Sequence, residues 1–466
     1  MKKKRRIVLA VFLAYILYVI VGMLAPFIHQ KSVSDAGKEQ IRAEDFYQKP
    51  GEKKTDRAKI VEGNQEALDV RLDMIRKAEK EIIISTFDIR EGESTDDIFA
   101  ALTAAAQRGV KVKILVDGLY GTVHMSGKEI FQAAGSHPNI EIRFYNTPNP
   151  LKPWTIHGCL HDKYLVTDDR YLLMGGRNMF DYFIGTHKGK SVGLDREILV
   201  VNTGGLKNSA VRQVKEYFKE VWNLDVCKTK FNQWSEKKRS KEISRLLKHN
   251  KELKVPDLDY ETITVPVKKA TLVTNPTHIY GKEPYVWETM KQLMLDADER
   301  VLIHTPYAVF SDEMYEGMKE VKRKVPDTTI ILNSIASGDN ICASADYRRN
   351  RQNILDTGVQ ICEYMGRHST HGKSSVSDDD MAVVGSYNFY CRSTYVDTET
   401  MLVVQGEEIA DQLAQNLQTL QDGSLTVDKN GKYMEKKGVK ERKIDSGKNR
   451  LITVLSYIIQ CVRYMV

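Results

Sequence analysis

Two stretches repeat one pattern, HDKYLVTDDRYLLMGGRN at residues 161–178 and HGKSSVSDDDMAVVGSYN at residues 371–388. In each stretch Lys follows His by two positions and Asp follows it by seven, while Gly and Asn follow by 14 and 17. At ordinary residue frequencies, one such set is expected by chance in roughly one chain in several thousand, before a second copy is required. The repetition therefore indicates a function that both stretches share.

Apolar residues precede and follow an acidic turn in both copies, which is typical of two short strands joined as a hairpin. Residues two apart on a strand face the same side, so His161 and Lys163 point together, as His371 and Lys373 do in the second copy. The glycine that ends the second strand lets the backbone approach a ligand closely. Two imidazoles, two ammonium groups and two amides could then converge on one tetrahedral anion.

This double pattern resembles the signature of the phospholipase D superfamily, a His-x-Lys motif with its Asp and a following Gly-x-x-Asn. Two segments, GGRNMFDYF at 175–183 and LNSIASGD at 332–339, look like those of the bacterial cardiolipin synthases of the C type. The resemblance covers most of residues 60–410. It implies an α/β fold of two similar halves, each a mixed β-sheet flanked by helices, with the active site at their interface.

The resemblance also implies roles for individual side chains. The expected catalytic set comprises the His, Lys and Asp of both motifs: His161, Lys163, Asp168, His371, Lys373 and Asp378. Within this set, Asp168 and Asp378 are expected to fix the turn and the neighbouring charge rather than to react. The substrate phosphate is expected to be held by both lysines and by Asn178 and Asn388, with Ser386 assisting.

An Asp-x-Glu sequence lies downstream of each motif, at residues 195–197 and 397–399. In the superfamily a carboxylate in this region orients the motif histidine, so Glu197 and Glu399 are expected to do so here. The alternative is that both are acids exposed at strand ends, because carboxylates usually lie on the surface.

Phosphodiester cleavage needs a nucleophile, an acid for the leaving oxygen, and charge stabilisation at the phosphoryl oxygens. Histidine can fill the first two roles because it changes charge near neutral pH. The resemblance favours His161 as the nucleophile, which forms a phosphohistidine, and His371 as the acid and base, although the residues alone leave the reverse assignment open. The mechanism requires no metal, the sequence shows no metal-ligand cluster, and no cofactor is expected.

The composition is that of a folded protein long enough for two domains, with 466 residues of which 42% are hydrophobic and 28% charged. The formal charge of +7 suits an anionic partner, but a modest excess of this kind is more often a solvated surface. The six cysteines show neither a CxxC pair nor zinc spacing. They are expected to be buried free thiols, with disulfides as the alternative outside the cytoplasm.

Helical and strand patterns alternate twice along the chain. The strand patterns at 81–89 and 110–117 enclose a helical pattern at 96–108, and a similar order recurs between residue 285 and the second motif. This indicates an internal duplication within an α/β layer architecture. The expected boundaries are a basic tip and anchor at 1–30, a tether at 31–62, a first half at 63–205, a basic helical bridge at 206–262, a second half at 263–421, and a basic tail with an amphipathic end at 422–466.

The N-terminal sequence predicts a membrane anchor. Five basic residues at 2–6 precede an uncharged apolar run at 7–28, which is long enough to cross a bilayer as a helix. A cleaved signal peptide is the rival interpretation, and the lack of a good small-x-small site disfavours it. The positive-inside rule then predicts a single-pass protein of the cell membrane, with a cytoplasmic N-terminus and an extracytoplasmic catalytic domain.

Two basic segments leave alternatives open. Residues 228–254 interleave Phe231 and Trp234 with basic residues, which suits either a membrane-facing helix or a solvated connector. Residues 451–466 are short for a membrane span and contain Arg463, so they either dock on the catalytic domain or lie in the bilayer surface.

The resemblance and the anchor together favour phosphatidyl transfer. The phosphatidyl group of one phospholipid would pass through a phosphohistidine to a second phospholipid, with phosphatidylglycerol and phosphatidylethanolamine both plausible partners. Hydrolysis by a phospholipase D uses the same residues, with water as the acceptor and phosphatidic acid as the product. The single anchor, in place of the two-span segment of the long cardiolipin synthases, leaves the second substrate open.

Two further interpretations are weaker. The anchor and the C-type resemblance count against a phosphodiesterase or nuclease, and DNA-adduct phosphodiesterases of the superfamily typically lack the motif Asp that both copies keep here. A non-catalytic scaffold that binds anionic lipid would require loss of motif residues, and neither motif has lost one. The expected partners are therefore phospholipids and the membrane, and no nucleic acid.

Overall fold

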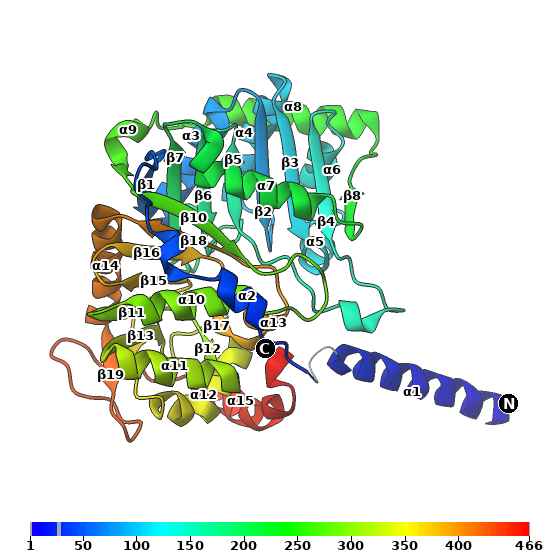
Figure 1. Cartoon of the computed structure of the whole chain (residues 1–466). Helices are drawn as coiled ribbons and strands as arrows, with labels where there is room; N and C mark the ends of the chain where they lie inside the picture. Colours follow the sequence, from blue (N-terminus) through cyan, green and yellow to red (C-terminus); the bar gives the residue numbers. More distant parts are fainter. Residues whose placement is uncertain (1, 26–28, 466) are drawn as a thin grey trace.

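The computed structural model describes residues 2–25 and 29–465, and it divides into two α/β halves that lie one above the other in Figure 1. Each half is built around a mixed β-sheet with helices on both faces. The expected fold class is confirmed.

The first sheet contains nine strands in the order β8-β4-β3-β2-β5-β6-β7-β1-β9. The neighbouring strands β2, β3 and β4 run parallel, and the remaining pairs are antiparallel. The strand bounds are β1 (Asp56–Val61), β2 (Glu81–Thr86), β3 (Lys111–Asp117), β4 (Ile140–Tyr145), β5 (Tyr164–Thr167), β6 (Tyr171–Gly175), β7 (Glu197–Asn202), β8 (Cys227–Lys230) and β9 (Val265–Pro266).

The second sheet repeats this plan with eight strands in the order β10-β18-β16-β15-β11-β13-β14-β19. Apart from β9, each strand of the first sheet has a counterpart with the same position and the same sense of pairing, so the internal duplication is visible in the fold. The bounds are β10 (Lys269–Thr274), β11 (Arg300–His304), β13 (Asp327–Asn333), β14 (Gln360–Tyr364), β15 (Ser374–Ser377), β16 (Met381–Gly385), β18 (Thr400–Gln405) and β19 (Ser424–Val427). The short strands β12 (Ala308–Val309) and β17 (Phe389–Tyr390) pair separately.

Two amphipathic helices, α7 (Ala210–Trp222) and α14 (Glu407–Asp422), pack between the two sheets. Their apolar residues recur at helical spacing, as in Ile409, Leu413 and Leu417 of α14. They share one core with the inward-facing residues of both sheets, such as Leu172 of β6 and Ala382 of β16. The alternate residues of the same strands face the outer cores, because successive side chains on a strand point to opposite faces.

Further helices cover the outer faces of the sheets. The first sheet is covered by α3 (Asn64–Lys77), α4 (Glu93–Gln107), α6 (Glu129–Gly135) and α8 (Glu236–Glu252). The second sheet is covered by α10 (Tyr285–Asp296), α11 (Asp312–Lys324) and α12 (Ile341–Leu355). The result is a five-layer molecule in which the α7–α14 layer joins the two halves.

Three expected domain boundaries need correction. Residues 56–61, expected in a tether, form β1 and pair with β7, so the first half begins before residue 63. Residues 206–262 are not a separate bridge, because α7 lies in the central layer, β8 forms the edge of the first sheet, and α8 packs on α4 and α6. The second half extends past residue 421, because β19 pairs with β14.

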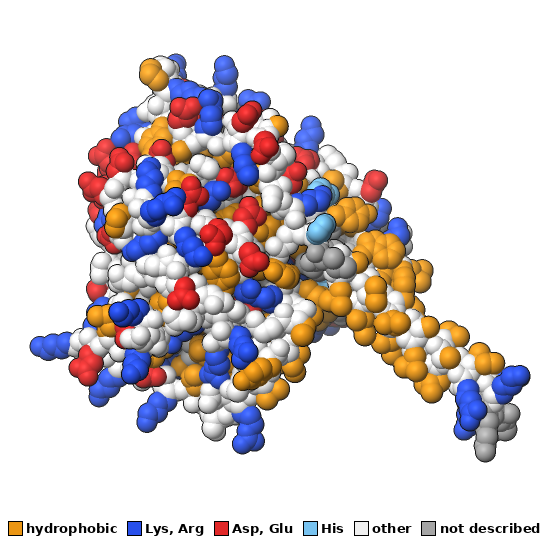
Figure 2. Space-filling view, turned by 60° about the horizontal axis from the view of Figure 1, so that its bottom comes forward, with side chains coloured by type: hydrophobic (Ala, Val, Ile, Leu, Met, Phe, Trp, Pro, Cys, Tyr) orange, Lys and Arg blue, Asp and Glu red, His pale blue; other side chains and the backbone are white. Residues whose placement is uncertain are grey.

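The helix α1 (Lys2–Leu24) projects from the body of the molecule (Figure 1). Among the described residues it is the one helix long and apolar enough to cross a membrane, a test that a signal sequence also passes. Figure 2 shows hydrophobic side chains along its surface and basic side chains at its free end. Residues 26–28 of the expected anchor lie outside the described part of the chain.

The C-terminal helix α15 (Ser446–Ile458) docks on the second half of the fold, which is one of the two expected arrangements. Ile452 is buried against α12, and Ile459 just beyond the helix is buried with it. The opposite face of α15 leaves Leu451, Val454 and Tyr457 exposed. All six cysteines fall within the described residues and are free, four of them buried.

Candidate active site

The two motif hairpins, β5–β6 and β15–β16, meet where the halves of the chain join. The segment that leads into His161 pairs with Thr398 of the second half, and the segment that leads into His371 pairs with Leu194 of the first half. The His161 N–H donates to the Thr398 hydroxyl at 3.0 Å, and the His371 N–H donates to the Leu194 carbonyl at 2.6 Å. Each motif is therefore held in place by backbone from the other half.

Each histidine is also oriented by a carboxylate from the opposite half. His161 Nδ1 lies 2.9 Å from Glu399 Oε1, and His371 Nδ1 lies 2.6 Å from Asp195 Oδ2. With Nδ1 engaged, Nε2 is the ring nitrogen left for the substrate at His161, whereas Nε2 of His371 also lies 3.1 Å from Lys373 Nζ. The contact expected of Glu399 is present.

The contact expected of Glu197 is absent, and Asp195 takes its place. Glu197 is buried in an ion pair with Arg71 and lies 3.5 Å from Arg177, so its carboxylate holds arginines instead of a histidine. The reason is strand register. Gly175 pairs with Glu197, while the equivalent Gly385 pairs with Met401, so Asp195 and Glu399 occupy equivalent positions two residues earlier.

Both motif lysines are buried beside their histidines. Lys163 Nζ donates to the His161 carbonyl at 2.6 Å, and Lys373 Nζ lies 3.1 Å from His371 Nε2. Burial lowers the pKa of Lys163 to about 8, and that of Lys373 to about 7, from the ordinary value of 10.5, while nearby carboxylates oppose the change. An anionic ligand between the motifs would raise both values again.

Asn178 and Asn388 follow the hairpins at equivalent places. Both side chains are buried, and among the described residues the Oδ1 atom of each makes no hydrogen bond. The unused atom is a hydrogen-bond acceptor, whereas phosphate oxygens need donors such as the amide N–H groups. The phosphate-binding role of these two asparagines therefore stays a prediction.

Ser386 does not have a free hydroxyl for phosphate. Its side chain is fully buried and donates to the Glu399 carboxylate, whose other oxygen accepts from Ser393. The expectation that Ser386 assists phosphate binding is therefore corrected, because its hydroxyl holds the carboxylate that orients His161. Ser393 has the same role and was not predicted from the sequence.

Asp168 and Asp378 fix the hairpin turns, as expected, and do not belong with the reacting groups. Asp168 accepts three backbone N–H bonds at 2.8–2.9 Å from residues 79–81, where β2 begins. Asp378 does the same at 2.8–3.0 Å for residues 298–300, where β11 begins. Both adopt positive φ, 53° and 51°, which Asp tolerates better than most residues.

An open cleft of about 870 Å³ reaches His371 and Asn178. Aromatic rings line its floor, with Phe183 4.8 Å from the His371 ring and Phe87 5.0 Å from the His161 ring. Arg90, Lys190 and Asp339 are among the polar residues that line it. The cleft is lined by His371, so a phosphodiester bound in it could contact that histidine.

The chain matches the family model described as "Cardiolipin synthase, PLD-like domain" over residues 72–222 and 290–421, which is more than half of its length. It belongs to that phospholipase D-like family. The two matched segments correspond to the two halves of the fold and include both motifs.

Among related phospholipase D-like proteins, cardiolipin synthase C of Escherichia coli is 24% identical over 402 residues, covering 75% of this chain and 81% of that protein. Cardiolipin synthase B of Salmonella typhi is 26% identical over 379 residues, covering 79% and 81%. The crystal structure of phosphatidylserine synthase from Haemophilus influenzae shares the fold with a TM-score of 0.65 at 14% identity, covering 92% of this chain and all of that one.

The two histidine–carboxylate pairs of this phospholipase D-like site differ electrostatically. Burial raises the pKa of Glu399 well above its ordinary value, and burial with nearby lysines lowers that of His161. Although burial opposes it, His371 and Lys373 lower the pKa of Asp195. Burial and Lys373 lower the pKa of His371 as well, and Asp195 opposes this decrease. The ionised Asp195 therefore favours protonation of His371 more than the Glu399 carboxyl group favours protonation of His161.

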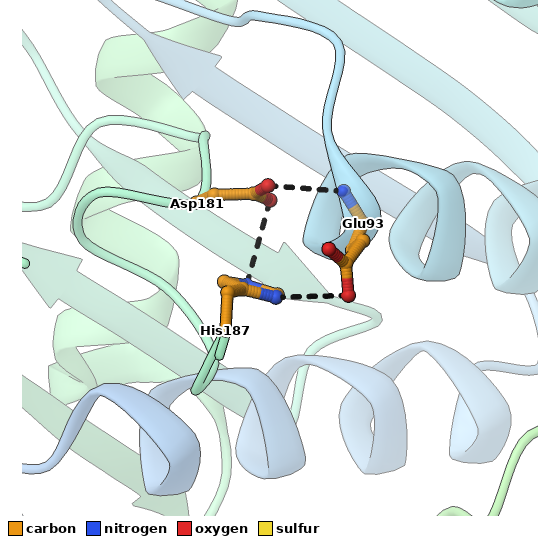
Figure 3. Close-up of side chains that lie close together, drawn as sticks. All are labelled: Glu93, Asp181 and His187. Atoms are coloured by element: carbon orange, nitrogen blue, oxygen red, sulfur yellow. Dashed lines mark hydrogen bonds and ion pairs between the residues drawn. The ribbon is translucent and has the colours of Figure 1, made fainter. Parts of the chain in front are cut away.

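A second polar cluster lies at the edge of the cleft and is shown in Figure 3. His187 is 3.3 Å from Glu93 and 3.5 Å from Asp181, and Asp181 accepts backbone N–H bonds at the start of α4. Lys190 pairs with both carboxylates, at 3.1 and 2.6 Å. Its ammonium group already balances the charge that a metal ion would balance, so the cluster fastens the loop around residues 181–190 to α4 as a wall of the cleft.

Proposed function

We propose that the chain is a membrane-anchored phosphatidyltransferase of the cardiolipin synthase type. The observation that carries the proposal is the crossed arrangement of the motifs, in which Glu399 engages His161 and Asp195 engages His371 across the junction of the halves. The family match supports a phospholipid-modifying enzyme of the phospholipase D type.

In the first step His161 Nε2 attacks the phosphorus of a phosphatidyl donor. The bond from phosphorus to the headgroup oxygen breaks, and a proton passes from His371 to that oxygen, which leaves as an alcohol. The phosphatidyl group remains on His161 as a phosphohistidine. The ionised Asp195 stabilises the imidazolium form of His371 that this step requires.

In the second step a hydroxyl of another phospholipid gives its proton to His371 and attacks phosphorus. The phosphorus–nitrogen bond breaks, and His161 returns to its neutral form. Lys163, Lys373 and the amides of Asn178 and Asn388 hold the phosphoryl oxygens throughout. With phosphatidylglycerol as donor and acceptor, the products are cardiolipin and glycerol in equal amounts.

The test is product analysis with the purified full-length protein in phosphatidylglycerol vesicles. Transfer predicts that cardiolipin and glycerol appear together in a one-to-one ratio. Phosphatidic acid as the sole lipid product would show hydrolysis instead. Vesicles that also contain phosphatidylethanolamine test whether this lipid is the second substrate. If the enzyme uses phosphatidylethanolamine as the phosphatidyl donor, ethanolamine is released.

We further propose that α1 is the single span, with the basic residues at its start in the cytoplasm and the catalytic body outside it. The apolar length of α1 and its basic free end support this topology. Accessibility of residues at either end of α1 to a membrane-impermeant reagent in intact cells tests the orientation.

A further inference from the structure

The loop between β4 and β5, residues 148–155 with the sequence PNPLKPWT, reaches out beside α1 (Figure 1). The Tyr15 hydroxyl donates to the Pro150 carbonyl at 3.0 Å, and the Tyr18 hydroxyl donates to the Leu151 carbonyl at 2.7 Å. The Trp154 ring meets the Tyr18 ring edge-on at 6.4 Å. The 148–155 loop is thus docked on the side of the helix.

We infer that the 148–155 loop is inserted into the bilayer beside the anchor and holds the mouth of the active site at the membrane surface. This inference rests on the proposed spanning role of α1. Its ligand is the lipid bilayer itself, and no further protein is required.

The depth of the loop follows from where it touches the helix. Tyr18 lies six residues before Leu24, the last residue of α1, which is roughly 9 Å of helix. Tyr15 lies nine residues before it, which is roughly 14 Å. Counted from Leu24, a loop in contact with both would pass the depth of about 5–10 Å that interfacial elements reach, and its contact with Tyr15 would lie near the middle of a hydrocarbon core about 30 Å thick.

The side chains of the loop suit that depth. Leu151 is 72% exposed in the loop. If the loop were not inserted in the membrane, this large apolar side chain would be in contact with water. Trp154 has an amphipathic ring of the kind enriched at membrane interfaces. Lys152 is the one charged residue between Pro148 and Thr155, and its long stem can carry the ammonium group back to the headgroups.

The backbone of the loop is suited to lipid as well, because a bilayer core cannot hydrogen-bond to exposed backbone groups. Pro148, Pro150 and Pro153 have no N–H to satisfy. The Leu151 N–H donates to the Asn149 side chain, and the N–H groups of Lys152 and Thr155 donate to carbonyls within the loop. The two tyrosines of α1 satisfy the carbonyls of Pro150 and Leu151, which face the helix.

The base of the loop is tied rigidly to the site. Asn146 Nδ2 donates to the Thr155 carbonyl at 2.6 Å and to the Gly158 carbonyl at 2.8 Å. The chain then runs directly into Leu160 and His161. Insertion of the loop would therefore set the height of His161 above the bilayer, so that a phosphate could reach it while the acyl chains of its lipid stay in the membrane.

Quenching of Trp154 in proteoliposomes tests this inference. We expect brominated acyl chains to quench the tryptophan fluorescence of the unmodified full-length protein and of the control variant Trp234→Phe to the same extent. The variant Trp154→Phe should lose at least half of that quenching. Trp234 is a suitable control because both rings are partly exposed. Equal quenching in all three proteins, or ready access of aqueous acrylamide to Trp154, would overturn the inference.

A charge at the tip of the loop gives a second test with a kinetic readout. Leu151→Asp should lower turnover of phosphatidylglycerol in vesicles by about tenfold, because a charged side chain enters the membrane unfavourably. Turnover of a monomeric short-chain phosphatidylglycerol should change by less than about twofold. The control Met434→Asp, at a position that is 55% exposed on another segment, should alter neither rate.

Unchanged vesicle turnover by Leu151→Asp would contradict insertion. If the unmodified protein turned over neither substrate, the proposed function would fail, and the quenching experiment would still decide the position of the loop.

Discussion

His161 Nδ1 lies 2.9 Å from the carboxylate of Glu399, a residue 238 positions later in the chain and in the other half of the fold. His371 has the reciprocal relationship with Asp195. The two pairs cross, so each histidine is oriented by a carboxylate from the other half of the fold, just before β7 or β18. This crossing makes several consequences measurable.

The first prediction separates Asp195 from Glu197. Asp195→Asn should lower kcat per folded molecule by roughly 10⁴-fold, the effect seen when the carboxylate that holds a catalytic imidazole is neutralised. Glu197→Gln should instead lower the free energy of unfolding by roughly 3–5 kcal/mol, because it leaves Arg71 and Arg177 without their buried partner. Activity per folded molecule and thermal unfolding, measured side by side, distinguish the two. A larger kinetic loss for Glu197→Gln would contradict this assignment.

The second prediction concerns the covalent intermediate. His371→Asn, with a donor whose leaving group needs no protonation, should accumulate a phosphatidyl group on His161, because the acceptor can no longer be deprotonated. Mass spectrometry of peptides after alkaline quenching locates the adduct, and His161→Asn serves as the control that should show none. An adduct on His371 in His161→Asn would reverse the assigned roles.

The third prediction concerns the buried charge of Lys373. Folding lowers the pKa of this group from 10.5 to about 7, so between these values the unfolded chain binds the additional proton and stability rises with pH. Below about pH 7 the folded protein must hold the charged form, which costs roughly 1.36 kcal/mol for each pH unit that separates the two pKa values. Lys373→Met should therefore stabilise the protein most near pH 6 and hardly at all near pH 10, as denaturant titrations at both values would show.

The same substitution should lower turnover by about 10²- to 10³-fold, since removing one preorganised electrostatic donor raises the barrier by about 2.7–4 kcal/mol. Lys228→Met, on the exposed edge strand β8, is the control and should leave both stability and turnover near those of the unmodified protein. A stability gain that did not depend on pH would argue against a charged Lys373 as its source.

The fourth prediction concerns the turn aspartates. Asp168→Asn or Asp378→Asn weakens three charge-assisted bonds to backbone N–H groups, so we expect a loss of roughly 1.5–3 kcal/mol in the free energy of unfolding. Turnover per folded molecule should stay within a few-fold. Asp169→Asn, which breaks only a partly exposed pair with Lys215, should change stability by less than about 1 kcal/mol. A complete loss of turnover with unchanged stability would place these residues among the reacting groups.

Much of this site could be predicted from local pattern. The His-x-Lys spacing forces two side chains to the same face of a strand, and the repetition of the whole stretch indicates that two such faces meet. The position of Asp168 and Asp378 in acidic turns between short strands also indicates a structural role from the neighbouring sequence alone. None of these inferences depends on which strands pair in the sheet.

The residues for which the prediction was wrong depend on information that is not local. Asp195 and Glu197 lie on the same side of one extended segment, and only the pairing of Gly175 with Glu197 decides which of them reaches across to His371. Matching the apolar runs that follow, LVVN at 199–202 and LVVQ at 402–405, does not find Asp195 either, because it aligns Glu399 with Arg196. Residues 56–61 resemble a tether in sequence because a short alternating strand after a polar stretch is visible only through its partner β7.

The crossing of the two histidine–carboxylate pairs also bears on the history of the duplication. A single ancestral copy would have carried a histidine and a carboxylate that cannot meet within one fold, since each reaches only its counterpart in a neighbour. Such an ancestor would have been active only as a homodimer, and fusion of two genes would have converted an encounter between subunits into a permanent one. After fusion the two acids were free to diverge, and an Asp on one side with a Glu on the other is what the present chain retains.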